Sequence, residues 1–420
     1  MIWKALSRAA ERPRIVYFVV LLALLTSSMF SFVVFPRISD SLNLLLDSDW
    51  YGKLGFGLYK NHSLSYYPSP YATVQRGPLY PLLIAGSLFL TGGWYPYSVQ
   101  IVQCLLFALT CALAFWIAST IWNRAIGLAA SVLCAIDPYL FWYAPRVWIE
   151  IMGVFLFTAI VAASLYMSLR PTIGRGILLG MTIALGALCK SIFLPFIVII
   201  PVLMFLWTGR RQTIRLVPLI VLGALVLILP WTARNWKLTG EIIPISIGAG
   251  FACLGGDIVA EHAWEAPFSF GKLSEFFVRD VLPELNAQIP KNLKGAKAEL
   301  FRENMAMRES MAKYRKDPWF FVKKIAFGSY WFWILGQTET KTLVIAVLEL
   351  PVLFAFLASI VLTAKRKRLW TIRGVHVSLV LLYYLMHLPV QAEARYSVVL
   401  VPTMILYAIG PLLEGKFETQ

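Results

Sequence analysis

Long apolar blocks follow one another along most of this chain, separated by short polar or basic segments. A helix that crosses a bilayer needs about 20 predominantly apolar residues. About ten blocks meet this requirement, namely 15–35, 97–121, 125–143, 147–169, 174–190, 191–208, 214–231, 341–363, 374–390 and 396–413. One soluble core cannot bury so many blocks, so the pattern predicts an all-α, multi-pass integral membrane protein.

Two shorter apolar stretches set the limits of the span count. The stretch 78–92 is bracketed by prolines and by a pair of glycines, and is barely long enough to cross. The stretch 322–336 follows a basic, aromatic-rich approach, which is typical of a helix that lies at the membrane interface. We expect neither stretch to cross, which gives ten spans. If both crossed, the total would be twelve, so the predicted number is about ten to twelve.

The composition agrees with a membrane protein. Of the 420 residues, 59% are apolar and 14% are charged, whereas ordinary soluble domains have roughly 25% charged residues; the mean hydropathy is +0.70. The net charge of +16 lies largely in short clusters between apolar blocks and forms no regular stripe, so no nucleic-acid partner is expected. The five cysteines form no CxxC pair, which argues against a disulfide framework or a zinc site.

Basic clusters predict the orientation, because Lys and Arg accumulate on the cytoplasmic side of membrane proteins. Residues 1–14 are basic and are expected to be a cytoplasmic tail before an uncleaved first span. The other cytoplasmic clusters are Arg170 with Arg175, Arg210 with Arg211 and Arg215, and the run 365–368 with Arg373. The predicted organisation is a transmembrane module at 15–231 with a first outer loop at 36–77, an extracytoplasmic loop region at 232–324, and C-terminal transmembrane helices at 325–420.

Acidic residues near the outer membrane face are candidates for chemistry, because charge there is costly to bury. The first outer loop places Asp47 and Asp49 on an otherwise apolar and aromatic stretch. Glu150 and Asp137 stand almost alone as acids in their part of the chain, with Arg146 between them. Each acid also has a structural interpretation. The loop acids would be ordinary solvated surface residues, Asp137 would stabilise a helix end, and Glu150 would form a buried ion pair with Arg146.

Three cationic residues are expected at the outer ends of spans, on the same side as these acids: Lys190, Arg234 and Arg395. Lone basic residues at span ends are often interfacial anchors, and this remains the alternative for each. Cations that converge with carboxylates at the outer surface suit a lipid phosphate, held by the cations while a carboxylate takes a proton from an acceptor. The residues therefore indicate a site for a phosphorylated amphiphile.

An ordered set of segments resembles the GT-C class of polyprenyl-phosphate-sugar-dependent glycosyltransferases, in the branch of protein O-mannosyltransferases and the lipid A aminoarabinose transferase. The segments are Asp47 to Tyr51, Arg76 to Pro81, Glu150 at a span start, Arg234-Asn235 with Pro244 to Ser246, and Glu393 to Tyr396. The resemblance implies a GT-C-like bundle with juxtamembrane helices, whose catalytic module is 15–231. It also implies a multi-pass protein of the plasma membrane, the bacterial inner membrane, with its active site facing the periplasm or exterior.

The resemblance further implies transfer of a monosaccharide, with inversion, from a polyprenyl-phosphate donor to a glycan, lipid or protein acceptor. The base would be Asp47, because the family's tyrosine follows by about four residues, with Asp49 as the alternative. The other implied roles are a second acidic position at Glu150, donor-phosphate binding by Lys190, Arg234 and Arg395, and a substrate pocket with Tyr51, Arg76, Tyr80 and Tyr396.

No cofactor is indicated with certainty. The outer loops contain no HxE or HxH spacing, so no metal site is expected, although a single divalent cation bound by scattered acids remains open. Two other functions remain as alternatives. A transporter or flippase of a lipid-linked sugar would use the same cations without a base, and a non-catalytic subunit of an envelope-polysaccharide complex would need neither.

Overall fold

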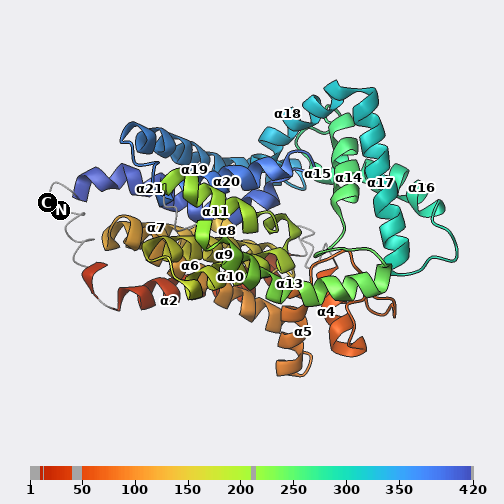
Figure 1. Cartoon of the computed structure of the whole chain (residues 1–420), viewed down its shortest axis with the longest axis horizontal. Helices are drawn as coiled ribbons and strands as arrows, with labels where there is room; N and C mark the ends of the chain where they lie inside the picture. The colour runs from red at the N-terminus through yellow and green to blue at the C-terminus, as the bar shows by residue number, and fades with distance from the viewer. Residues whose placement is uncertain (1–9, 13, 40–49, 210–213, 418–420) are drawn as a thin grey trace.

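The computed structural model describes residues 10–12, 14–39, 50–209 and 214–417. Within these ranges the chain is helical and contains no strand, apart from an isolated bridge between Ser65 and Ala72. Asp47 and Asp49, the two predicted bases, lie outside the described residues. Figure 1 shows an elongated bundle with a group of outer helices at one extremity and with the start of α2 (Ile15–Met29) and the end of α21 (Val401–Phe417) toward the other.

The bundle consists of apolar helices, as the hydropathy pattern predicts. Among the described residues, seven segments are long and apolar enough to cross a membrane, namely Ile15–Ile38, Tyr97–Ile121, Glu150–Leu169, Ser191–Thr208, Val217–Thr239, Glu339–Lys365 and Ala394–Glu414. Four shorter apolar helices accompany them, namely α5 (Leu79–Thr91), α7 (Arg124–Ile136), α10 (Ile173–Cys189) and α20 (Ile372–His387). The predicted all-α, multi-pass membrane class is confirmed, and seven of the described segments meet the length and composition of a span, fewer than the ten to twelve that the sequence predicts.

The long segments are assembled from named helices. They are α2 (Ile15–Met29) continued by η1 (Phe30–Val34) and α3 (Phe35–Ile38), then α6 (Tyr97–Ile121), α9 (Glu150–Leu169), η2 (Ser191–Phe193) with α11 (Phe196–Thr208), α13 (Val217–Thr239), α19 (Glu339–Lys365), and η4 (Ala394–Leu400) with α21 (Val401–Phe417). A short helix, α8 (Pro138–Phe141), follows α7. Asp137 caps it, because its side chain accepts hydrogen bonds from the backbone N–H groups of Tyr139 and Leu140. The helix-end alternative for Asp137 is therefore what the structure shows.

Small residues let neighbouring helices approach closely. A Cβ atom added to Gly180 of α10 would lie 2.0 Å from the carbonyl oxygen of Ile220 in α13. A Cβ atom added to Gly223 of α13 would lie 2.4 Å from the carbonyl oxygen of Ile177 in α10. The two backbones thus meet through reciprocal glycines, which is a common way for membrane helices to pack.

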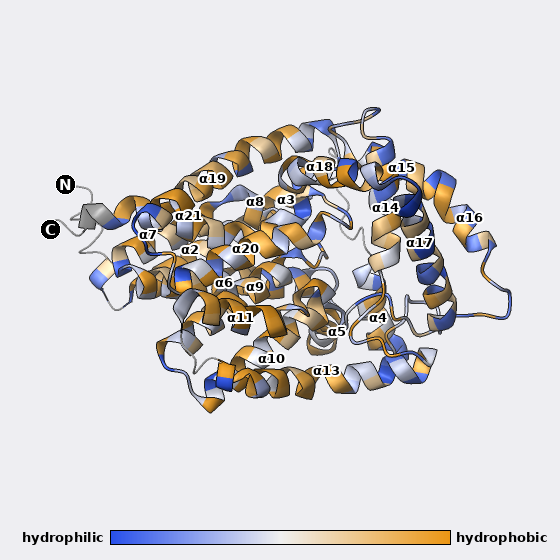
Figure 2. Ribbon diagram, turned by 45° about the horizontal axis from the view of Figure 1, so that its top comes forward, coloured by the Kyte–Doolittle hydropathy of each residue, from blue (hydrophilic) through white to orange (hydrophobic). Residues whose placement is uncertain are grey.

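The outer group of helices comes from two separate parts of the chain. It includes α4 (Tyr51–Asn61), α14 (Ala249–Glu261), α15 (Phe270–Phe276), η3 (Phe277–Val281), α16 (Leu282–Ala287), α17 (Ala296–Lys316) and α18 (Pro318–Ile334). Figure 2 shows that α17 is largely hydrophilic, in contrast to the apolar bundle. Buried polar bonds hold this group together: Lys324 of α18 donates to Asp257 of α14 at 2.8 Å, and Tyr314 of α17 donates to the same carboxylate oxygen at 2.5 Å.

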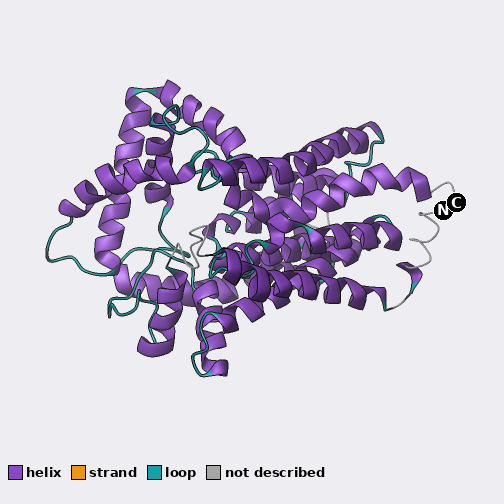
Figure 3. Cartoon of the chain, turned by 180° about the vertical axis from the view of Figure 1, so that it is seen from behind, coloured by secondary structure: helices purple, strands orange, loops and turns teal. Residues whose placement is uncertain are grey.

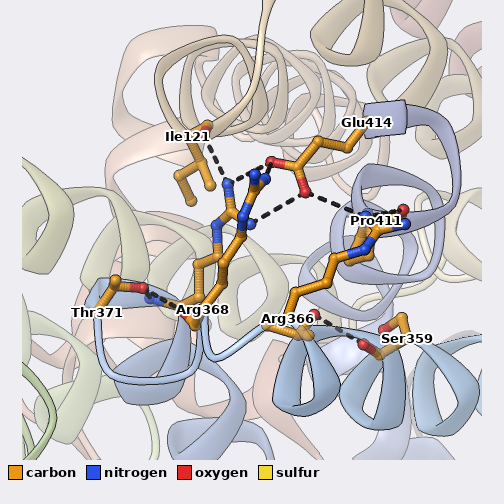
Figure 4. A network of polar contacts seen from close by, with 9 residues as sticks. Ile121, Ser359, Arg366, Arg368, Thr371, Pro411 and Glu414 are labelled. Atoms are coloured by element: carbon orange, nitrogen blue, oxygen red, sulfur yellow. Dashed lines mark hydrogen bonds and ion pairs between the residues drawn. The ribbon is translucent and has the colours of Figure 1, made fainter. Parts of the chain in front are cut away.

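A second polar network, drawn in Figure 4, lies near the end of α21, at the extremity of the bundle away from the outer helices (Figure 1). Glu414 of α21 pairs with Arg366, Arg368 and Arg373, and Arg373 also donates to the carbonyl oxygen of Ile121 at 3.2 Å. These contacts join the ends of α6, α19, α20 and α21. The arginines belong to a basic cluster that the sequence predicts to be cytoplasmic, so the network fits an orientation in which the outer helices face away from the cytoplasm.

Candidate active site

A cavity of about 480 Å³ lies where the outer helices meet the bundle. Its walls come from the start of α4, the segment 75–77, the start of α9, the turn 189–195, the segment 246–252 and the segment 386–396. The cavity brings together six of the residues that the sequence predicts for the site, namely Tyr51, Arg76, Glu150, Lys190, Arg395 and Tyr396. These residues are spread over most of the chain, so only the fold makes them neighbours.

Glu150 and Lys190 form an ion pair in this cavity. Glu150 is the first residue of α9 and is only 1% exposed, and its Oε1 atom lies 3.5 Å from the Nζ atom of Lys190. Lys190 has extended backbone geometry directly after α10, which turns its side chain out of the helix. The ion pair with Arg146, which the sequence left open for Glu150, is wrong, because the partner of the carboxylate is Lys190.

Arg395 is held at the cavity by its own neighbours in the chain. Glu393 is buried and accepts a hydrogen bond from Nε of Arg395 at 2.5 Å, while its other oxygen accepts from Gln337 at 3.2 Å. The guanidinium lies 5.2 Å from the ring centre of Tyr396 and 5.8 Å from that of Trp148. Arg395 lines this cavity and two others beside it, so it stands at the junction of all three.

Arg76 reaches the cavity from a segment that two other elements clamp. Arg234 of α13 donates to the carbonyl oxygen of Thr73 at 2.7 Å. Glu299 of α17 accepts from the Thr73 hydroxyl at 2.9 Å and from the Val74 N–H at 3.0 Å. Burial raises the pKa of Glu299 in spite of these donors. Arg234 itself does not line the cavity; its bond to Thr73 supports the segment that carries Arg76.

Gly77 fixes the position of the same segment against α10. A Cβ atom at Gly77 would lie 2.2 Å from the carbonyl oxygen of Leu188, so only glycine fits there. Tyr80 also stands behind the wall, where it is fully buried and donates to Gln103 at 2.9 Å. Its ring packs edge-on against Tyr51, which does line the cavity, with ring centres 5.1 Å apart.

A second cavity, of about 510 Å³, lies on the other side of Arg395 and is mainly apolar. Its apolar walls come from η1, from the segment that includes α8, and from α19, and Arg146 and Lys341 stand at its polar end. A third cavity of about 580 Å³ shares this polar end and opens among residues 269–275 and 337–341. Sequence reasoning missed the importance of Arg146; the one available signal was an arginine set in the aromatic stretch 141–148.

Arg146 is buried without a conventional partner. It is 3% exposed, and its Nε and Nη2 atoms have no hydrogen-bond partner among the described residues. Its guanidinium lies between 4.7 and 5.9 Å from the ring centres of Trp148, Trp142 and Phe35. Burial lowers the pKa of Arg146 to about 10, which leaves the group charged near neutral pH.

Within the described ranges, no group of three or more His, Cys, Asp or Glu side chains could hold a metal ion. The loop acids Asp47 and Asp49 are outside those ranges. The groups that the described residues present to a ligand in the 480 Å³ cavity are cations, a buried carboxylate and aromatic rings.

Comparison of the sequence with protein-family profiles finds no match, and no curated protein matches it either. Solved structures do match the fold. The oligosaccharyltransferase of Archaeoglobus fulgidus, tethered with an acceptor peptide that contains the NVT sequon, aligns with a TM-score of 0.60 and 15% identity over 97% of this chain and 50% of its own. AglB of the same organism, in complex with an inhibitory peptide and a dolichol-phosphate, aligns with a TM-score of 0.56 and 14% identity over 96% of this chain and 50% of its own.

The apo structure of ArnT from Cupriavidus metallidurans also matches, with a TM-score of 0.40 and 14% identity over 90% of this chain and 77% of its own. This chain spans about half the length of the oligosaccharyltransferase chains. At this level of identity the likeness shows the fold, which is that of the GT-C membrane glycosyltransferases. The fold predicted from the resemblance is thereby confirmed.

Proposed function

We propose that the protein is a GT-C glycosyltransferase that moves a monosaccharide from a polyprenyl-phosphate donor to an acceptor at the outer membrane face. The observation that carries the proposal is the 480 Å³ cavity, in which Arg76, Lys190 and Arg395 surround one buried carboxylate, Glu150. With Glu393, which binds Arg395, counted as a second acid, the three cations still leave a net positive charge, and this suits a ligand that carries negative charge. The GT-C fold, and the dolichol-phosphate in the AglB complex, support a lipid phosphate as that ligand.

The cations would act on the leaving group. Cleavage of a sugar–phosphate bond leaves negative charge on the lipid phosphate, and Lys190 and Arg395 are placed to stabilise that charge as it develops. Their own carboxylate partners, Glu150 and Glu393, hold the two side chains in position before the reaction. Positioned charges need little reorganisation during the step, which is the main reason why such sites accelerate reactions.

The donor's apolar chain would leave the cavity toward the bilayer. Ile192, Pro195 and Met386 form an apolar part of the cavity wall, on η2, at the start of α11 and on α20. This is a membrane-facing side of the bundle, since α11 exposes large apolar side chains such as Val198 and Val202. The arrangement suits an amphiphile whose phosphate lies at the cations and whose chain lies among lipids.

The base would come from the first outer loop, with Asp47 first and Asp49 second. Tyr51, two residues after Asp49 in the same loop region, lines the cavity at the start of α4. A carboxylate there would take the proton of an acceptor hydroxyl as its oxygen attacks the anomeric carbon from the face opposite the phosphate. A single displacement of this kind inverts the configuration at that carbon.

The test is a strain that lacks this protein, analysed by mass spectrometry of its polyprenyl-phosphate sugars and of its glycans, lipids and proteins. We expect one sugar to disappear from an acceptor while its polyprenyl-phosphate form persists, and the wild-type gene to restore the sugar. A flippase would instead restore movement of the lipid-linked sugar across liposome membranes without any transfer. Transfer that continues unchanged in the deleted strain would contradict the proposal.

A further inference from the structure

Arg146 carries a buried charge, and its Nε and Nη2 atoms have no hydrogen-bond partner in the described part of the chain. The loop between α8 and α9 carries it inward, and Trp142, Trp148 and Phe35 surround it with aromatic faces. Cation–π contacts stabilise such a group in part. They leave its Nε and Nη2 donors unsatisfied, and a buried charge without a hydrogen-bonded counter-ion costs free energy. An anion with two or more acceptor oxygens would remove that cost, because guanidinium binds phosphate in a bidentate manner.

An apolar groove runs from Arg146 to the side of the bundle. The 510 Å³ cavity is lined by Phe30 of η1, by Phe141 of α8 and by Val344, Ile345 and Leu348 of α19. Val344 is 52% exposed on the outer face of α19, so the groove borders the surface that faces lipid. Figure 2 shows α19 along one edge of the bundle and α10 and α13 along the opposite edge.

Charge at the head of the groove complements a phosphate. Arg146, Lys341 and Arg395 line that end, and the carboxylate of Glu393 is bonded to Arg395 and Gln337. A groove that is apolar along its length and cationic at one end matches a lipid with an anionic head. A peptide would need partners for its backbone N–H and C=O groups, and an apolar groove between membrane helices does not supply them.

This groove and the donor cavity flank Arg395 from different sides. The donor cavity includes Glu150, Lys190 and His387, whereas the groove includes none of them. Two grooves that border lipid and meet at one arginine provide room for two amphiphiles with their heads together. The second groove is therefore not needed for the donor.

We propose that the groove at Arg146 binds the acceptor, and that the acceptor is an anionic lipid whose phosphate contacts Arg146 and Lys341. This inference rests on the proposed function. In the transfer step, a hydroxyl oxygen of the lipid head bonds to the anomeric carbon of the sugar. The bond between that carbon and the donor's phosphate oxygen breaks with its electron pair on the phosphate, and the hydroxyl proton passes to the loop carboxylate.

Binding measurements test the two sites separately. The full-length protein is placed in phosphatidylcholine nanodiscs, and native mass spectrometry counts bound decaprenyl phosphate and dioleoyl phosphatidic acid. We expect both lipids to bind together. Arg146→Gln should weaken phosphatidic acid binding about tenfold or more, a loss of about 1.4 kcal/mol, and leave decaprenyl phosphate binding within about twofold. Lys190→Gln should do the reverse.

A groove-filling variant keeps the test valid if Arg146→Gln fails to fold. Val344→Trp should block phosphatidic acid, whereas Val347→Trp, on the same helix and 65% exposed but outside the groove, should not. Competition of the two lipids for one site, or phosphatidic acid binding that neither Arg146→Gln nor Val344→Trp weakens, would overturn the inference. Failure of decaprenyl phosphate to bind the wild-type protein would instead count against the proposed function.

The acceptor class has its own readout in cells. In the deleted strain complemented with the wild-type gene, we expect the restored sugar in the solvent-extractable lipid fraction, and we expect Arg146→Gln to reduce that amount. Recovery of the sugar only in protein would overturn the lipid acceptor while leaving glycosyl transfer intact.

Discussion

Nζ of Lys190 and Oε1 of Glu150 lie 3.5 Å apart, with the Glu150 side chain 1% exposed and the Lys190 side chain 12% exposed, and each charge compensates the other. Removing one partner of a buried ion pair is expected to cost about 3–5 kcal/mol, because the other charge is left uncompensated. Lys190 also has a proposed role in transfer, because it lines the cavity where the donor's phosphate is proposed to lie. Stability and transfer can therefore be separated by substitution.

Lys190→Gln should lower kcat/KM for sugar transfer about 100-fold or more, as loss of a charge-stabilising donor does in other enzymes. It should also lower the melting temperature of the purified protein. The double variant Lys190→Gln with Glu150→Gln should recover much of the melting temperature, because no charge stays unpaired, but should not recover transfer. Recovery of both, measured by thermal unfolding and by transfer kinetics, would mean that Lys190 serves only the fold.

Glu299 makes stability depend on pH. Burial raises its pKa in the folded protein above the usual value, so the folded state favours the protonated carboxyl. Its contribution to stability is therefore full at acidic pH and is lost as pH rises through the raised pKa. The melting temperature of the wild type relative to Glu299→Gln should fall between pH 4.5 and pH 7.5. If the melting temperature of the wild type relative to Glu299→Gln instead rose between pH 4.5 and pH 7.5, the raised pKa of Glu299 would be contradicted.

Arg146 shows that the pairing of individual charged side chains could not be predicted from the sequence. Glu150 and Arg146 are four residues apart, which makes an ion pair a reasonable expectation from spacing alone. The loop between α8 and α9 prevents it, because the two side chains face different cavities. Which charges pair inside a membrane bundle depends on helix packing, and a single sequence does not contain that information.

At the scale of elements, α10 and α13 illustrate how much hydropathy can predict. The apolar blocks 174–190 and 214–231 correspond closely to the two helices, because about 20 apolar residues in lipid have little choice but to form a helix. Hydropathy does not predict that the helices touch through Gly180 and Gly223, since glycine has no strong signature in an apolar run. It also gives no sign that α13 continues to Thr239, beyond its apolar block, where it positions Arg234.

Gly180→Ala should lower the free energy of unfolding by about 1–3 kcal/mol, the usual cost of overpacking a close contact. Its new Cβ atom would lie 2.0 Å from the backbone of α13. Gly174→Ala is the matched control, because it lies in the same helix with nothing within 4 Å of its Cβ position and should be neutral or slightly stabilising. Thermal unfolding of the two variants compares them; equal melting temperatures would show that α10 and α13 pack more loosely than the structure indicates.

The clamp on segment 73–77 links α13 and α17 to the cavity. Arg234→Gln removes the bond to the Thr73 carbonyl and loosens the position of Arg76, so kcat/KM for transfer should fall about tenfold. Affinity for decaprenyl phosphate should change by less than about twofold if Arg234 acts through Arg76. Lys237→Gln, an exposed change on the same helix, serves as the control. A large loss of decaprenyl phosphate affinity would instead restore Arg234 to direct phosphate binding.

At the scale of the whole molecule, the fold divides the protein into an apolar bundle and an outer group of helices, with the candidate site between them (Figure 1). Composition and hydropathy predict the bundle, and the order of short segments predicts the GT-C fold. The meeting of Tyr51, Arg76, Glu150, Lys190, Arg395 and Tyr396 needs three-dimensional structure, because these residues come from three separate helices and two connecting segments. The same is true of the apolar groove on the far side of Arg395.

The central claim is that the outer cavity catalyses transfer of a sugar from a polyprenyl phosphate. Its most direct test uses the purified protein in proteoliposomes with the donor lipid isolated from the deleted strain and membranes of that strain as the source of acceptor. Mass spectrometry follows released polyprenyl phosphate together with the transferred sugar. We expect the wild type to release both in equal amounts, and the double variant Asp47→Asn with Asp49→Asn to lose at least about 99% of the rate, as loss of a general base does. Unchanged transfer by the double variant, or no release by the wild type, would contradict the claim.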